Sequence, residues 1–191
     1  MSSFEFFTVL LSIIVSLGVA SLLHNVVRLI QEAPRVQFSL TWALWAATIF
    51  NVQVIYWFRA WAYHEHFTIE ARTAIPPLVL AIIAFMACGL ATPHIADAGS
   101  VDLREFHDRQ GRKYQIAYAA FMAVAVVQGL LMAPIAGNTE GLVRDSIVEG
   151  AAAALAIACA VFHRQAWLQI SCPILFLTSG LAYYGTLMGK Y

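Results

Sequence analysis

The chain has 191 residues, of which 61% are hydrophobic and 12% are charged, and its formal net charge at pH 7 is zero. An ordinary soluble domain carries about a quarter charged residues. The composition therefore excludes an ordinary soluble domain and predicts a protein surrounded by the lipid bilayer, with no nucleic-acid partner.

Six apolar stretches follow one another, each long enough for a transmembrane helix, which needs about 20 residues to cross about 30 Å of hydrocarbon. Helices satisfy their backbone polar groups internally, as lipid requires. We therefore expect one all-α membrane domain over residues 1–191, a bundle of about six transmembrane helices. The expected helices are Phe4–Ile30, Phe38–Tyr63, Thr73–Thr92, Tyr114–Ala136, Leu142–Phe162 and Ala166–Met188.

The first stretch lacks the basic start of a signal peptide and is too long for one, so we keep it as a helix. With six crossings both termini lie on one side of the membrane. Lysine and arginine favour the cytoplasmic side. Both termini are therefore predicted on the outer, periplasmic side of a bacterial inner membrane, with seven basic residues inside (Arg28, Arg35, Arg104, Arg109, Arg112, Lys113, Arg164) and four outside (Arg59, Arg72, Arg144, Lys190).

Tryptophans lie near both ends of the second expected helix. Trp42 and Trp45 are near one end, and Trp57 and Trp61 are near the other. Tryptophan is enriched at both membrane interfaces. We expect these four side chains to lie in two interfacial belts.

Polar and small residues recur every four positions in the first expected helix: Thr8, Ser12, Ser16, Ala20, His24 and Arg28. Small residues at this spacing let helices approach closely, which favours a packing role for Ser12, Ser16 and Ala20. His24 and Arg28 are candidates for the inner part of a transport pathway, because ionisable groups within the membrane are costly. Arg28 alternatively extends to the inner headgroups.

Three carboxylates collect at the predicted outer ends. Glu5 begins the first helix, and Asp145 and Glu149 lie four residues apart on the fifth, so they share a face. Either they form ion pairs with nearby arginines (Arg59, Arg72, Arg144), or they line a mouth that accepts cations or protons.

Uncharged amides lie at mid-depth between these ends. Asn51 and Gln53 are on the second expected helix and Gln128 is on the fourth. Such amides either join helices or line a narrow polar path. We predict Asn51 and Gln128 as the pair that faces the pathway.

Three histidines fall at one predicted inner level: His24, His94 and His163. Together they are weak candidates for a metal or haem site, and the His64-Glu65-His66 run is weaker still, since positions i and i+2 do not share a helical face. The cysteines (Cys88, Cys159, Cys172) form no Cys-x-x-Cys pair and fall inside apolar stretches. No cofactor and no catalytic residue is predicted.

The largest polar connector runs from Asp97 to Lys113 and alternates in charge. It is expected to be a solvated cytoplasmic turn, or alternatively a contact surface for a cytoplasmic partner. The alanine-rich fifth helix favours tight packing against neighbours or a second subunit. A homo-oligomer is predicted as the working unit.

The chain resembles a loosely defined group of small uncharacterised bacterial multi-pass inner-membrane proteins with about six helices. The resemblance covers most of the chain and rests on Leu-Gly-Val-Ala-Ser-Leu-Leu-His-Asn-Val-Val-Arg-Leu-Ile in the first helix, Pro76-Pro77 in the third, and Asp-Leu-Arg-Glu-Phe before the fourth. It implies a membrane location and carries no activity.

Two functions of different classes follow from these residues. The first is a small transporter or channel, for protons or another small ion, with Glu5, His24, Arg28, Asn51, Gln128, Asp145 and Glu149 along the pathway. The second is a non-transporting sensor or partner-binding subunit that acts through residues 97–113. An enzymatic role has less support than either.

Overall fold

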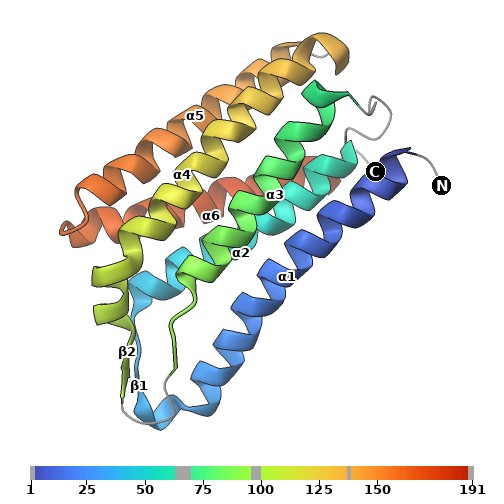
Figure 1. Cartoon of the computed structure of the whole chain (residues 1–191). Helices are drawn as coiled ribbons and strands as arrows, with labels where there is room; N and C mark the ends of the chain where they lie inside the picture. Colours follow the sequence, from blue (N-terminus) through green and yellow to red (C-terminus); the bar gives the residue numbers. More distant parts are fainter. Residues whose placement is uncertain (1–2, 63–69, 96–99, 137–138, 189–191) are drawn as a thin grey trace.

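The computed structural model describes residues 3–62, 70–95, 100–136 and 139–188, and these residues are almost entirely helical. Six α-helices and one pair of short strands make up the fold (Figure 1). The elements are α1 (Ser3–Gln31), the 3-10 turn Ala33–Arg35, β1 (Val36–Gln37), α2 (Leu40–Ala62), α3 (Ala71–Ala91), β2 (Val101–Asp102), α4 (Leu103–Ala136), α5 (Thr139–Val161) and α6 (Ala166–Met188).

The helices run along a common direction as one elongated bundle (Figure 1). α4 packs along α5, α3 lies against both α4 and α1, and α6 lies against α2. We call the end that holds β1, β2 and the α5–α6 turn at 162–165 the strand end. The other end is where α1, α3 and α5 begin. We call it the cavity end, because a cavity lies near it.

The strands explain why α4 begins at Leu103, earlier than the expected Tyr114. β1 and β2 pair in parallel, with Val36 opposite Val101 and Gln37 opposite Asp102. Asp102 Oδ1 then accepts the backbone N–H groups of Arg104 at 2.8 Å and Glu105 at 3.0 Å, as an N-cap does. The expectation of a solvated turn up to Lys113 is therefore wrong from Leu103 onward, and Asp97 lies outside the described residues.

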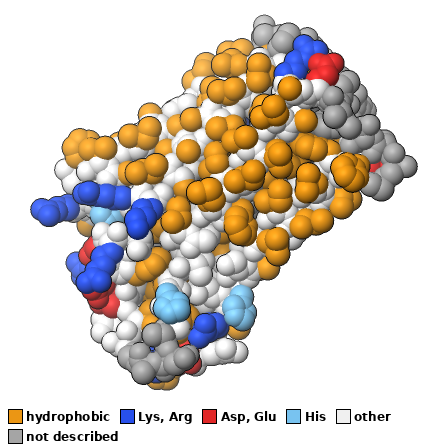
Figure 2. Space-filling model, viewed as in Figure 1, with side chains coloured by type: hydrophobic (Ala, Val, Ile, Leu, Met, Phe, Trp, Pro, Cys, Tyr) orange, Lys and Arg blue, Asp and Glu red, His pale blue; other side chains and the backbone are white. Residues whose placement is uncertain are grey.

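Four of the described helices are long and apolar enough to cross a membrane: α1, α3, α4 and α6. Figure 2 shows a broad band of hydrophobic side chains over one face, with charged side chains at its two ends. A contiguous exposed apolar surface of this kind is typical of a face that contacts lipid or another protein. The described chain is a helical protein with membrane-spanning character, while six crossings and outer termini stay predictions.

The remaining helices, α2 and α5, fall below this apolarity for a visible reason. α2 carries Asn51, Gln53 and Arg59, and the first half of α5 carries Asp145 and Glu149 among its four charged residues. Both helices contribute polar side chains to a cavity inside the bundle.

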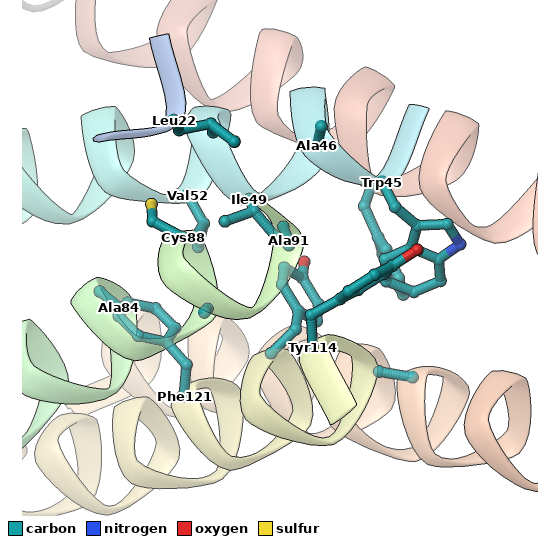
Figure 3. Packing of buried hydrophobic residues seen from close by; sticks show 14 of the residues in the cluster. Leu22, Trp45, Ala46, Ile49, Val52, Ala84, Cys88, Ala91, Tyr114 and Phe121 are labelled. Atoms are coloured by element: carbon teal, nitrogen blue, oxygen red, sulfur yellow. The ribbon is translucent and has the colours of Figure 1, made fainter. Parts of the chain in front are cut away.

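The tryptophan belt is wrong for the strand end of α2. Trp42 and Trp45 are 5% and 0% exposed, so they belong to the core and not to an interface. Trp45 packs against Tyr114, Tyr118 and Phe176, with ring centroids 6.1–6.2 Å apart. Figure 3 shows Tyr114 extending from α4 toward Trp45. Trp57 is exposed, and the side chain of Trp61 lies outside the described part.

The packing face of α1 also differs from the expected stripe. Ser16 and Ala20 are exposed, and Ser12 accepts a hydrogen bond from Trp57 Nε1 at 3.2 Å. The buried positions alternate in steps of four and three, which follows the 3.6-residue turn more closely than a step of four. They are Leu11, Val15, Gly18, Leu22, Asn25 and Leu29.

Candidate functional site

A cavity of about 420 Å³ lies between α2, α4, α5 and α6 near the cavity end of the bundle. Its walls are mostly apolar, and α3 contributes Leu80. Polar side chains from all four of these helices are set among them, including Ser179 and Tyr183 on α6. The others are Thr48, Asn51, Tyr56 and Arg59 on α2, Tyr118 and Gln128 on α4, and Arg144, Asp145 and Glu149 on α5.

Arg59 and Glu149 form an ion pair across this cavity, from α2 to α5. Their side chains are only 19% and 8% exposed. A charge is expensive to remove from water, and a buried pair holds only while both partners are present. Glu149 therefore forms an ion pair with an arginine, as one of the two alternatives for the outer carboxylates predicted, and it also lines the cavity.

Asp145 lies one helical turn before Glu149 and also lines the cavity. Its Oδ1 is 3.8 Å from Arg144 Nε, and the Arg144 side chain is largely exposed. An exposed pair at this distance contributes little to stability. Asp145 is therefore the more accessible of the two carboxylates, with a side chain 37% exposed.

Asn51 is packed directly on the α6 backbone. A Cβ added at Gly180 would overlap the Asn51 amide, so this amide can lie where it does because residue 180 is glycine. Gln128 is 9% exposed and reaches the same cavity from α4. The predicted pair of pathway amides therefore shares one cavity.

Gln53 has the other role that buried amides can take. Its Nε2 donates to the Ala84 carbonyl at 2.6 Å and lies 3.3 Å from Cys88 Sγ, which joins α2 to α3. It is fully buried. This amide is a helix-to-helix contact, and Asn51 and Gln128 are the ones that line open space.

Three predicted pathway residues lie elsewhere. Glu5 is exposed at the start of α1, His24 is exposed in the last third of that helix, and Arg28 is half-buried one turn later. None of them lines the cavity. The pathway residues thus divide into a cavity group of Asn51, Gln128, Asp145 and Glu149 and a separate set on α1.

The three histidines predicted at the inner level do not form a metal cluster. His24 and His94 are exposed, whereas His163 is buried against His107, with ring centroids 4.8 Å apart. Among the residues that the structure describes, no group of three or more histidine, cysteine or acidic side chains is placed to hold a metal ion. His64, Glu65 and His66 lie outside that part of the chain.

Sequence reasoning gave too little weight to two residues. Arg59 was expected only as one of several possible counter-charges, yet it lies at four-residue spacing from Ile55 and Asn51 on the cavity face of α2. That spacing was a usable signal. His107 was hidden in a segment expected to be a turn, where no helical face could be assigned.

A scan of protein-family models and searches of curated proteins and solved structures each found no match to this chain. The resemblance to a group of bacterial multi-pass proteins therefore stays a prediction. The geometry of the cavity carries the functional argument.

Proposed function

We propose that this chain is a small membrane transporter or channel for protons or another small ion, with the cavity between α2, α4, α5 and α6 as its binding site. The observation that supports this most is the convergence of Asn51, Gln128, Asp145 and Glu149 from three helices on one cavity. The cavity has room for on the order of ten water molecules. A hydrated space beside a carboxylate is what a mobile proton or cation requires.

Arg59 gives the site a way to exchange charge. In the described state its guanidinium neutralises Glu149. An incoming cation or proton that binds the carboxylate takes over this role and releases Arg59 from Glu149. The ion pair is then the resting state of the binding site. The Glu149 charge is neutralised by Arg59 in the empty site and by the bound ion in the filled site, so it is never buried alone.

Flux through proteoliposomes tests the proposal. The purified protein is reconstituted with an internal pH dye, and proton entry is followed under an imposed potassium diffusion potential. Glu149→Gln is expected to abolish the flux, and Glu105→Gln, an exposed carboxylate at the strand end, is the matched control and leaves it unchanged. Wild-type flux no greater than that of empty liposomes, for protons and for several other ions, would contradict the transport function.

Loss of flux must be separated from unfolding. Glu149→Gln alone leaves Arg59 buried and unpaired, which costs about 3–5 kcal/mol in comparable buried pairs. The double variant Arg59→Gln/Glu149→Gln removes both charges and is expected to restore most of the melting temperature while the flux stays absent. Recovery of flux in the double variant would show that the Arg59–Glu149 pair only stabilises the fold and that Glu149 does not bind the transported ion.

A second function is favoured by the start of α4. This segment is a charged helix with Arg104, Asp108 and Arg109 exposed, and Arg109 pairs with Glu105 at 2.6 Å. A regular helix is a better docking element than an irregular turn. We infer a partner-binding role for it if charge reversals at these three exposed positions damage cell function while the flux of the purified protein is unchanged.

A further inference from the structure

A second buried polar cluster lies at the strand end of the bundle, where α4 begins and α5 turns into α6. It contains His107, Tyr114 and Gln115 on α4, His163 in the turn, and Gln169 on α6. All five are less than 9% exposed. Polar side chains buried this deeply need partners, so their hydrogen bonds define which atoms carry protons.

The Cys159 carbonyl determines the orientation of the side-chain amides of Gln169 and Gln115. Gln169 Nε2 donates to the Cys159 carbonyl at 2.7 Å, which leaves Gln169 Oε1 as an acceptor. Gln115 Nε2 donates to that Oε1. Since a carbonyl oxygen only accepts, Gln115 must present its own Oε1 to the next residue, which is His163.

His163 therefore faces a hydrogen-bond acceptor on both sides of its ring. Nε2 lies 3.1 Å from the His107 carbonyl oxygen, and Nδ1 lies 3.4 Å from Gln115 Oε1. A neutral imidazole has one N–H and can satisfy only one of these oxygens. The longer contact at Nδ1 is the place where one further proton would form a hydrogen bond.

Gly111 makes this arrangement possible. A Cβ at this position would lie 2.5 Å from His163 Cε1 and 3.1 Å from His107 Cε1 and Nδ1. The two rings can therefore lie over α4 only because residue 111 has no side chain. Two imidazoles packed over a glycine indicate a built site and not a chance contact.

Several charged and titratable groups surround His163. On α4, Asp108 favours its protonated form and Arg112 opposes it, the His107 ring lies against it, and the Tyr114 hydroxyl contacts His107. α5 and α6 carry the buried thiols Cys159 and Cys172 in this region, and Arg164, next to His163 in the chain, is exposed. Burial lowers the pKa of the His163 imidazole, although the bond to the His107 carbonyl opposes this. The ring is thus a proton site that fills on acidification and releases its proton readily.

Tyrosines on α4 lie between this cluster and the cavity. Tyr118 lines the cavity, and Tyr114, one turn along the same face, contacts His107 Nδ1 through its hydroxyl. Both tyrosines pack on Trp45. The two tyrosines thus lie along one face of α4 between the cavity that Glu149 lines and the cluster around His163.

We propose that His163, between the His107 carbonyl and Gln115 Oε1, is a second proton-binding site at the strand end, where protons enter or leave the pathway that begins at Glu149. The proton bonds to Nδ1, the ring becomes an imidazolium, and release regenerates the Nε2–H form. This role rests on the proposed transport function, while proton binding at His163 does not.

Nitrogen NMR of ¹⁵N-histidine-labelled protein in lipid tests the site directly, because the Nδ1 and Nε2 signals report the protonation of each ring atom. The His163 signals are identified by their loss in His163→Gln. On acidification we expect Nδ1 to gain a proton while Nε2 keeps its own. The matched variant Gln115→Met removes the acceptor and is expected to weaken proton binding about tenfold, the value of one hydrogen bond to a charged group.

The exposed Gln165→Met serves as the control and is expected to leave the titration unchanged. A His163 ring that stays neutral down to pH 4, or a titration that Gln115→Met does not move, would overturn the proton site. In proteoliposomes, His163→Gln is expected to lower proton flux at least tenfold. If His163→Gln keeps full proton flux while Glu149→Gln has none, His163 is not part of the pathway, and the transport function is still supported.

Discussion

Two glycines, Gly180 and Gly111, allow the neighbouring polar side chains to lie where they do. Gly180 receives the Asn51 amide at the cavity, and Gly111 receives the imidazoles of His107 and His163. Sequence alone could not assign these roles, because a helical glycine is read as a weak point until the neighbour that covers it is known.

Gly111→Ala is expected to destabilise the protein by about 1–3 kcal/mol, as overpacking of a tight site does. The added methyl group would overlap His163 and force both rings to move. Gly89→Ala is the control, since nothing lies within 4 Å of the position a Cβ would occupy in α3. That variant is expected to be neutral or up to about 1 kcal/mol more stable, because alanine favours helix. Thermal unfolding in detergent measures both, and equal melting temperatures would contradict the prediction.

The lowered pKa of His163 predicts a pH dependence of stability. Burial makes the folded protein bind this proton more weakly than the unfolded chain, whose histidines titrate near pH 6.5. The unfolded state therefore binds more protons below that pH, and the free energy of unfolding falls as the pH drops through this range. His163→Gln is expected to flatten the decrease between pH 7 and pH 5, and an identical pH profile in both proteins would argue against a buried neutral ring.

At the scale of a helix, α1 shows how a sequence pattern can point to the wrong face. The four-residue stripe was conspicuous because its members are polar or small, but a strict step of four drifts around the helix by about 40° each time. The face that packs alternates in steps of four and three and consists mainly of ordinary apolar residues. Its one small member, Gly18, lies against the α3 backbone.

Gly18 and Ser16 form a matched pair of positions on α1. A Cβ at Gly18 would lie 3.2 Å from Phe85 Cα, a backbone atom that cannot move aside, whereas Ser16 is exposed. Gly18→Leu is expected to separate α1 from α3 and lower the stability by at least about 1–3 kcal/mol. Ser16→Leu is expected to have little effect on a lipid-facing surface. Equal sensitivity of the two positions in thermal unfolding would restore the serine stripe as the packing face.

The start of α4 was missed for a different physical reason. The charge-rich run before Tyr114 was weighed by polarity, which favours a solvated connector, although Asp102 followed by Glu105 is a pattern that begins helices. The cap and the β1–β2 pair stabilise a start that hydropathy cannot detect. The capping pattern could be read from neighbouring residues. The pairing of β2 with β1 could not, because β1 is distant in the sequence.

Polarity in the whole molecule is arranged at two ends joined by an aromatic core. Hydropathy alone located the six helices, because long apolar runs dominate every other signal. It also singled out Asn51, Gln128, Asp145 and Glu149, which share the cavity. It could not decide which helices are neighbours, so His163 was grouped with His24 and His94 and not with His107.

The number of membrane crossings depends on whether α2 and α5 also span the bilayer. Gln37 and Arg72, both exposed, are separated by α2 alone, and Arg72 and the exposed Gln165 are separated by α3, α4 and α5. If all six helices cross, Arg72 lies on the side opposite to Gln37 and Gln165, and the predicted outer termini would put Arg72 outside. Single cysteines at the three positions, treated in intact spheroplasts with a membrane-impermeant maleimide, are expected to react only at position 72 until the membrane is permeabilised.

The native cysteines are buried, so the unmodified chain gives the background labelling. Equal reactivity at positions 37 and 72 would mean that α2 does not cross, and equal reactivity at 72 and 165 would mean the same for α5, since α3 and α4 together return the chain to its starting side. Either result would place the Arg59–Glu149 pair near the membrane surface. The cavity would then be a surface pocket for a ligand, because a pathway for ions needs its charged residues between crossing helices.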